Sequence, residues 1–307
     1  MEKGTCLVRY QGHQKEISAL AWSSDGRFLA SVSREGVVHV WEAMSGRLVR
    51  QFGNYADNAF ALAWSPDGEY LASCGGLRSV RENQVDIWQP HSGHLLWTYR
   101  AFEGEVSSLA WTRNSDELAI GCWDSTVHLW NRVTGSGQIL FTTDTNPDFI
   151  YAVSWSPGED YLAVATDEGQ VVVLRRADKW QVAFTARRSR GGVNDAQWAP
   201  HQTWIASVGS AIQVWEAFSG TTITTYAGHA GSVRKLCWSP NGCYLASADS
   251  DHTVHIWEAA TGRLVQRYEG YEGCIKGGLG WLPDGTALAW GNEAKEVEVW
   301  DVSFLAE

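Results

Sequence analysis

Short apolar segments, separated by turn-forming residues, alternate along the whole chain of 307 residues. The clearest unit runs from Gly228 to Trp257, where two apolar segments rich in β-branched residues precede a third that ends in tryptophan. Between them lie Ser-Pro-Asn-Gly at residues 239–242 and Asp-Ser-Asp at residues 249–251. Apolar runs bounded in this way by turn residues predict three short antiparallel strands.

The same unit recurs seven times, at a spacing of roughly 40–45 residues. Its first tryptophan lies at Trp22, Trp64, Trp111, Trp155, Trp198, Trp238 and Trp281, and its closing position lies at Trp41, Trp88, Trp130, Leu174, Trp215, Trp257 and Trp300. A small sheet cannot bury both of its faces alone, so neighbouring units are expected to pack against one another. The last unit lacks the apolar segment that should follow its closing position, and residues 6–10 carry that pattern. We therefore predict that the N-terminal strand completes the last unit and leaves no open edge there.

The repeated tryptophans, together with Gly12-His13 and the Trp-Ser-Pro-Asp-Gly motif at residues 64–68, give the chain its resemblance to the WD-repeat (WD40) family. The regular Trp-Ser-Pro-Asp-Gly and Leu-Ala-Ser units are similar to those of bacterial members. The resemblance extends over nearly the whole chain. It implies an all-β, seven-bladed β-propeller of four-stranded antiparallel blades, which forms a single domain of residues 1–307.

Composition narrows the classes of function. Lys and Arg number 24 against 35 Asp and Glu, and the resulting net charge of -11 argues against a general role in coating nucleic acid. No apolar run approaches the roughly 18 residues that a membrane-spanning helix needs. The six cysteines form no Cys-x-x-Cys pair, which is typical of free thiols in a reducing compartment. We therefore expect a cytoplasmic monomer that does not bind membranes.

Two units carry histidine, serine, an acid and tryptophan at matching positions. The two sets are His13, Ser31, Glu35 and Trp41 in the first unit, and His229, Ser247, Asp251 and Trp257 in the sixth. They look like a Ser-His-Asp catalytic set, but a catalytic serine needs exposure and an oxyanion hole, and the spacing supplies neither. In the WD-repeat family this combination is a structural hydrogen-bond relay. The resemblance therefore implies a structural role for both sets and no catalytic residue.

Three further histidines, His39, His128 and His255, occupy the same position just ahead of a closing tryptophan. We expect each to be a partly exposed side chain on its own blade, far from the other two, and we predict no metal site. No phosphate-binding glycine motif follows any predicted strand, and no cofactor is predicted.

Departures from the repeat concentrate on one face, called the top face here. It comprises the loop before the innermost strand of each blade and the turn between its second and third strands. The predicted partner-binding residues on this face are Arg34, Tyr55, Arg78, Arg81, Phe102, Trp123, Phe149, Arg187, Arg188, Arg190 and Tyr271. Exposed aromatic residues beside arginines are typical of binding hot spots. For Tyr55, Phe102 and Tyr271 an alternative stays open, in which they fill gaps left by missing relay histidines.

The resulting hypothesis is a non-catalytic scaffold that binds protein or peptide partners on the top face. One alternative is a sensor propeller that works with a separate signalling ATPase or kinase. A second alternative is an enzyme with its site at the central channel. The sequence does not identify the partner.

Overall fold

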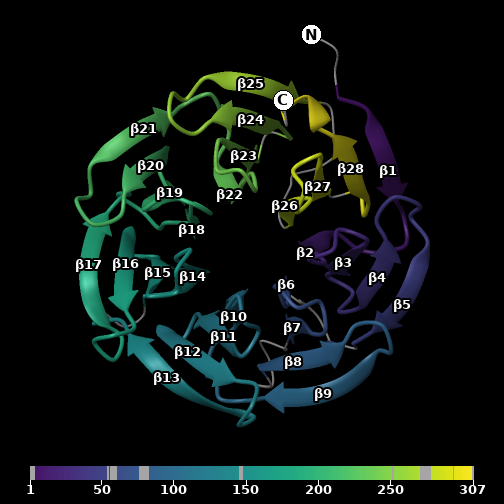
Figure 1. The fold of residues 1–307 in the computed structure, drawn as a ribbon, viewed down its shortest axis with the longest axis horizontal. Coiled ribbons are helices and arrows are strands. Elements are labelled where there is room, and N and C mark those ends of the chain that lie inside the picture. Colours follow the sequence, from purple (N-terminus) through teal and green to yellow (C-terminus); the bar gives the residue numbers. More distant parts are fainter. Residues whose placement is uncertain are drawn as a thin grey trace.

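The computed structural model describes residues 4–305, except 54, 56–60, 76–82, 145–147, 251, 270–277 and 293. The described residues form seven four-stranded antiparallel sheets, which follow one another around a central axis (Figure 1). The predicted seven-bladed propeller is therefore confirmed. In the described part of the chain, no helix is both long and apolar enough to cross a membrane.

The strands of each blade follow one another from the channel outwards. Blade one consists of β2 (Ile17–Trp22), β3 (Phe28–Ser33), β4 (Val38–Glu42) and β5 (Leu48–Phe52), and blade two consists of β6 (Leu62–Trp64), β7 (Leu71–Gly75), β8 (Gln84–Gln89) and β9 (His94–Tyr99). Blade three consists of β10 (Val106–Trp111), β11 (Glu117–Cys122), β12 (Thr126–Asn131) and β13 (Ser136–Thr142), and blade four consists of β14 (Ile150–Trp155), β15 (Tyr161–Thr166), β16 (Gln170–Arg175) and β17 (Gln181–Arg187). Blade five consists of β18 (Asp195–Trp198), β19 (Trp204–Val208), β20 (Ile212–Glu216) and β21 (Thr222–Tyr226), and blade six consists of β22 (Val233–Trp238), β23 (Tyr244–Asp249), β24 (Val254–Glu258) and β25 (Leu264–Tyr268). Blade seven consists of β26 (Leu279–Trp281), β27 (Ala287–Gly291), β28 (Val297–Asp301) and β1 (Cys6–Tyr10). A short 3-10 helix, η1 (Ser303–Leu305), follows β28.

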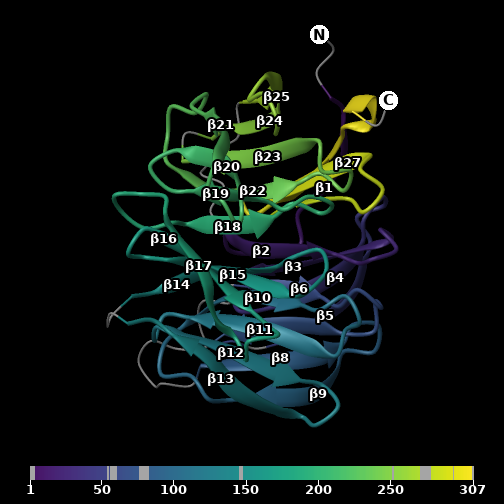
Figure 2. The same cartoon turned by 60° about the vertical axis from the view of Figure 1, so that its left-hand side comes forward.

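The ring closes as predicted, because β1 is the outermost strand of blade seven. It pairs antiparallel with β28, so that Tyr10 lies opposite Val297 and Cys6 lies opposite Trp300. Figure 2 shows the same arrangement in an oblique view, with β1 next to the last strands of the chain. The first and last strands thus share one sheet, and the ring has no open seam.

In five of the seven repeats the first tryptophan donates a hydrogen bond to the preceding blade, whereas Trp64 donates to Gly68 of its own blade. The indole N–H of Trp22 donates to the carbonyl of Gly280 at 2.9 Å, and that of Trp155 donates to Ala110 at 2.9 Å. Trp111, Trp238 and Trp281 form the same kind of bond to the preceding blade. A buried indole needs a hydrogen-bond acceptor, and here the adjacent sheet supplies it. These residues therefore contribute both packing and a directional bond between blades.

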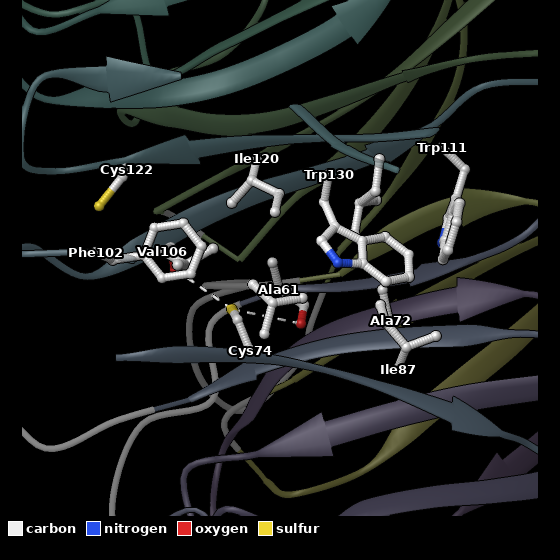
Figure 3. Packing of buried hydrophobic residues seen from close by; sticks show 12 residues of the cluster. Ala61, Ala72, Cys74, Ile87, Phe102, Val106, Trp111, Ile120, Cys122 and Trp130 are labelled. Carbon is white, nitrogen blue, oxygen red and sulfur yellow. Dashed lines mark hydrogen bonds between the residues drawn. The ribbon is translucent and has the colours of Figure 1, made fainter. Parts of the chain in front are cut away.

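The apolar core lies between blades rather than within a single sheet. Figure 3 shows the contact between blades two and three, where Cys74 and Ile87 face Phe102 and Trp130. The Cys74 thiol donates to the carbonyl of Val106 at 3.4 Å, across the blade boundary. All five cysteines that the structure describes are free thiols.

Candidate functional site

Each described loop of the top face is bonded to the neighbouring turn of its own blade. The backbone N–H of Arg34 donates to Glu16 in blade one, that of Trp123 donates to Glu105 in blade three, and that of Asp167 donates to Phe149 in blade four, each at 2.9 Å. These bonds fix the loop before the innermost strand against the turn between the second and third strands. Backbone hydrogen bonds therefore hold the loops of the top face in fixed positions on the ring.

The relay of blade one is assembled from the loop before β2 and from β3 and β4. His13 Nε2 and Ser31 Oγ are 2.8 Å apart, and His13 Nδ1 lies 2.8 Å from Glu35 Oε1. The Trp41 indole N–H donates to Ser31 Oγ at 3.1 Å. Ser31 and Trp41 are fully buried, so the serine hydroxyl is closed to substrate. The structure brings together all four residues of this set.

The relay of blade six uses a different acid from the one predicted. His229 Nδ1 lies 2.8 Å from Asp249 Oδ2, while Ser247 Oγ contacts His229 Nε2 at 2.7 Å and accepts from Trp257 at 3.1 Å. Asp251 lies outside the described residues. Asp249 ends β23 and also accepts the backbone N–H of Thr253 at 2.9 Å, which fixes its carboxylate against the histidine.

The histidines ahead of the closing tryptophans are buried, so the expectation that they are partly exposed is wrong. His39 is 4% exposed and His255 is 1% exposed. Each contacts the hydroxyl of a tyrosine on an outermost strand, His39 with Tyr10 at 2.8 Å and His255 with Tyr226 at 2.7 Å. His128 is also buried and contacts Tyr99 at 3.1 Å. A buried imidazole needs such a partner because it has lost its contacts with water.

The two relay blades place one histidine on another. The rings of His13 and His39 stack with centroids 4.0 Å apart, and those of His229 and His255 stack at 3.9 Å. Potential metal-ligand atoms of His13, Glu35 and His39 lie within 4.8 Å of one another. Both ring nitrogens of His13 and Nδ1 of His39 already take part in hydrogen bonds. A metal ion would therefore have to displace the relay.

Acidification should destabilise the protein through the buried histidines. Burial, with the neighbouring histidine as a second cause, lowers the pKa of His39 and of His255 from 6.5 to about 4. Below pH 6.5 the unfolded chain binds protons that the folded chain does not, so stability falls as the pH falls towards 4. Between pH 6.5 and 5.5 these two histidines together should remove about 2 kcal/mol of unfolding free energy. Urea unfolding at pH 7.5, 6.5 and 5.5 measures this loss.

The carboxylates change the stability in a different pH range from the histidines, so this experiment can distinguish the two contributions. The pKa values of Glu35 and Asp249 are lowered, so their contribution is lost only below the ordinary carboxyl range. Burial raises the pKa of Asp195, which opposes the loss in part. A His39→Gln variant should show a shallower decline between pH 6.5 and 5.5, and an identical decline would contradict the assignment to this histidine.

Two of the predicted partner-binding aromatics are buried, and their expected exposure is wrong. Tyr55 is 5% exposed, and its hydroxyl bonds Ser73 Oγ at 2.6 Å and donates to Asp86 at 2.9 Å. Trp88 donates to the same serine at 2.8 Å, so tyrosine replaces histidine in a relay of blade two. Phe102 is 7% exposed and packs in the core between blades two and three (Figure 3). Both residues fill gaps where other blades carry histidine.

One of the predicted arginines is committed to the fold. The Arg188 guanidinium lies over the ring of Trp215 at 4.0 Å and donates to the carbonyl of Gly220 at 2.8 Å. Desolvation lowers its pKa, as expected for a cation that packs on an indole. Arg188 thus ties blade four to blade five and is not a free contact residue.

The remaining predicted residues divide by exposure. Arg34, Arg187 and Arg190 are exposed, whereas Trp123 and Phe149 are half-buried and pack together with centroids 5.7 Å apart. The residues Arg78, Arg81 and Tyr271 lie outside the described part of the chain.

Sequence reasoning missed Tyr151 and Arg234. In four blades the pairing of the two inner strands shifts by one residue, and the shift falls at Ser18, Ser107, Tyr151 and Arg234. At two of these positions the side chains, Ser18 and Ser107, line the central channel, whereas the Tyr151 hydroxyl donates to Asp167 in a turn of the top face. The signal was present, because this position always lies four residues before the first tryptophan and its residue type varies from blade to blade.

A cavity of about 400 Å³ occupies the central channel. Its wall includes Ser154, Asp195 and Lys235, and no histidine or cysteine is among the described residues that line it. Ser154 Oγ accepts the backbone N–H of Trp198 at 3.1 Å, and Asp195 lies 3.9 Å from the Lys235 ammonium. The described residues of the wall therefore hold no serine activated by a histidine.

Comparison with known proteins gives matches to two family descriptions. The family described as "WD domain, G-beta repeat" matches residues 4–42, 46–82, 93–131 and 220–258, about half of the chain. The family described as "Anaphase-promoting complex subunit 4 WD40 domain" matches residues 153–231.

Individual relatives match over shorter stretches. "Anaphase-promoting complex subunit cdc20" of Dictyostelium discoideum is 29% identical over 136 residues, which cover 42% of this chain and 26% of the relative. "Chromatin assembly factor 1 subunit FAS2 homolog" of Oryza sativa subsp. japonica is 26% identical over 45% of this chain and 30% of the relative. "Protein HIR1" of Cryptococcus neoformans is 25% identical over 45% of this chain and 19% of the relative. The chain thus spans less than a third of each relative's length. These relatives are eukaryotic and do not test the resemblance to bacterial members.

Proposed function

This chain belongs to the WD40-repeat family, and we propose that its propeller is a non-catalytic platform that binds a protein or peptide partner on the top face. Residues 1–307 act in this proposal as one domain. The blades supply rigidity, and the loops of the top face supply the contacts, as binding loops on rigid scaffolds commonly do.

The observation that carries the proposal is a contrast between two sets of side chains: the relay groups are buried and hydrogen bonded, whereas aromatic rings and arginines on the top face remain accessible to solvent. The relay serines Ser31 and Ser247 are fully buried and hydrogen bonded, so they hold the blades and offer no nucleophile. On the top face, Trp123 and Phe149 keep part of their surface in solvent, and exposed arginines stand on neighbouring loops. Rigid aromatic side chains of this kind provide large contact area at low entropic cost.

The names of the relatives fit the same role. Two of them are described as subunits, one of the anaphase-promoting complex and one of chromatin assembly factor 1. Both therefore work within multi-protein assemblies, and an assembly role is proposed here for this chain. The free thiols of the five described cysteines support a reducing compartment such as the cytoplasm, with the propeller acting there as a monomer.

Loss of a partner on mutation of the top face tests the proposal. Affinity capture from the source lysate should be compared between wild type and a Trp123→Ala, Arg190→Glu variant. Neither side chain belongs to a relay, so the melting temperature should stay within a few degrees of wild type. The variant should lose at least one protein that wild type captures, as measured by quantitative mass spectrometry.

A matched variant on the opposite face is the control. Phe218 and Arg263 lie in the turns between the third and fourth strands of blades five and six, and both are exposed. A Phe218→Ala, Arg263→Glu variant removes one aromatic ring and reverses one charge, as the top-face variant does. It should retain the partner. A partner lost only with the control variant would place the interface on the wrong side for this proposal.

A further inference from the structure

Three aromatic rings from different parts of blades three and four meet on the top face. Trp123 lies in the turn between β11 and β12, Phe149 lies in the loop before β14, and Tyr151 lies at the bulge of β14. The ring of Trp123 is 5.7 Å from that of Phe149 and 6.3 Å from that of Tyr151, to which it is nearly perpendicular. All three side chains are half-buried. We call these three residues the aromatic cluster.

The aromatic cluster is held in place by its surroundings. The backbone bonds from Trp123 to Glu105 and from Asp167 to Phe149 fix two of its three segments. The Tyr151 hydroxyl donates to Asp167 Oδ1 at 2.9 Å, which fixes the orientation of the third ring. Burial and Asp167 raise the pKa of Tyr151 to about 12, so the phenol is neutral at physiological pH. The rings therefore form a pre-organised surface.

The loops that carry the aromatic cluster are acidic. The described segments 103–105, 123–126, 148–151 and 167–169 contain no lysine or arginine, and their acidic residues are Glu103, Glu105, Asp124, Asp148, Asp167 and Glu168. Asp124 and Asp148 accept backbone N–H groups, so part of their charge supports the loops themselves. Asp167 is exposed at the edge of the aromatic cluster. Arg187 and Arg190 follow on the next loop of the ring.

The same chain already combines rings, carboxylates and guanidinium groups elsewhere. Arg176 lies over the rings of Trp155 and Trp180 at 5.2 and 4.9 Å and bonds Glu117 at 2.8 Å. Arg132 lies over Tyr70 at 5.2 Å and pairs with Asp116 at 2.6 Å. In both sets the ring face and the carboxylate attract the same cation from two sides. The half-buried aromatic cluster and the exposed Asp167 place the same two elements side by side on the top face.

We propose that the aromatic cluster binds a basic side chain, lysine or arginine, of the protein partner. This inference rests on the proposed top-face function and adds the chemistry of the bound group. The cation would contact the ring faces and pair with Asp167, and the net charge of -11 would attract a basic segment before contact. An acidic partner that uses Arg187 and Arg190 is the competing outcome.

Fluorine NMR on the full chain labelled with 5-fluorotryptophan tests the site directly. The signal of Trp123 is assigned with a Trp123→Phe variant, and that of Trp204, half-exposed between blades five and six, with Trp204→Phe. The probes are blocked tripeptides Gly-Xaa-Gly in which Xaa is arginine, lysine, citrulline or glutamate. Citrulline has nearly the shape of arginine and carries no charge. Arginine and lysine peptides should shift the Trp123 signal saturably and leave the Trp204 signal in place, whereas citrulline should not shift either.

Two variants separate the components of the site. Asp167→Asn should weaken binding of the arginine peptide about two- to fivefold, because it removes one partly exposed charge. Tyr151→Leu should abolish the saturable shift while circular dichroism stays that of wild type. The proposal is overturned if neither basic peptide shifts the Trp123 signal, if citrulline shifts it equally, or if only the glutamate peptide does so.

The outcome also distinguishes this proposal from the function on which it rests. A lysate partner that is lost with the top-face variant, together with a Trp123 signal that ignores both basic peptides, would keep the top-face function and reject the cation. Saturable binding of basic peptides, together with a partner lost only with the opposite-face variant, would keep the cation site and reject its use by that partner.

Discussion

Deletion of residues 1–10 should abolish the stable ring. These residues include β1, and without it β28 becomes an open edge that can pair with other chains. Tyr10 is buried, stacks on Trp41 with centroids 4.5 Å apart and bonds His39, so its loss alone should cost about 3–5 kcal/mol. Arg9 pairs with Glu298 at 2.9 Å, but its side chain is 52% exposed and solvent screens the pair, so this contact contributes much less than Tyr10. The loss at Tyr10 alone is a large part of the whole stability of a typical domain, about 5–15 kcal/mol, and the open edge of β28 adds to it.

Soluble yield and thermal unfolding followed by circular dichroism measure this effect. The truncated protein should be insoluble or should melt far below the full chain. Leu7 provides the matched control, because its side chain is 46% exposed on the outer side of the same strand. A Leu7→Ser variant should keep the strand and melt close to wild type. A truncated protein with an unchanged melting temperature would show that β1 does not close the ring.

The sequence was sufficient to predict the architecture because the repeat specifies it many times over. In five blades the first tryptophan packs a large ring and finds its hydrogen-bond acceptor on the preceding blade, as Trp22 does with Gly280. One atypical blade does not change the predicted fold. In blade four Leu174 replaces the closing tryptophan and is still fully buried. Repetition therefore makes a fold prediction tolerant of local exceptions.

The individual relay positions were harder to predict because several side chains can satisfy the same buried serine. Glu35 reaches His13 from the turn after β3, whereas the shorter Asp249 reaches His229 from the strand end itself. In blade two Tyr55 contacts Ser73 directly. Spacing in the sequence cannot distinguish these solutions, since each depends on side-chain length and on the direction of the loop.

The candidate site was predictable only in part, for a geometric reason. A β-bulge inserts an unpaired residue and changes which face the next side chains occupy, so alternation along the strand fails there. Tyr151 and Arg234 lie at such shifts and were therefore missed. Trp123 was predicted as a contact residue because a turn that only joins two strands does not require a bulky side chain. Whether such side chains lie side by side on the top face depends on the path of the backbone, and the spacing of the repeats does not specify that path.

Replacement of Trp257 by alanine should cost about 3–5 kcal/mol of unfolding free energy. The indole is fully buried, stacks on Tyr226 with centroids 4.6 Å apart and donates to Ser247, so the substitution opens a cavity and removes a bond. Substitution of His229 by alanine should cost less, about 1–3 kcal/mol, because it leaves Ser247 and Asp249 without their shared partner. Denaturant unfolding followed by circular dichroism gives both values.

Trp257→Phe separates packing from hydrogen bonding in the same relay. Phenylalanine keeps an aromatic ring against Tyr226 but has no N–H for Ser247, so it should cost about 1–2 kcal/mol, well below the alanine variant. Combining Trp257→Phe with Ser247→Ala forms a double-mutant cycle. If the indole bond stabilises blade six, the double variant should lose less than the sum of the two single variants, because the second substitution removes a bond that is already broken. Strict additivity, or an alanine variant at either Trp257 or His229 that unfolds like wild type, would show that the relay geometry contributes nothing to stability.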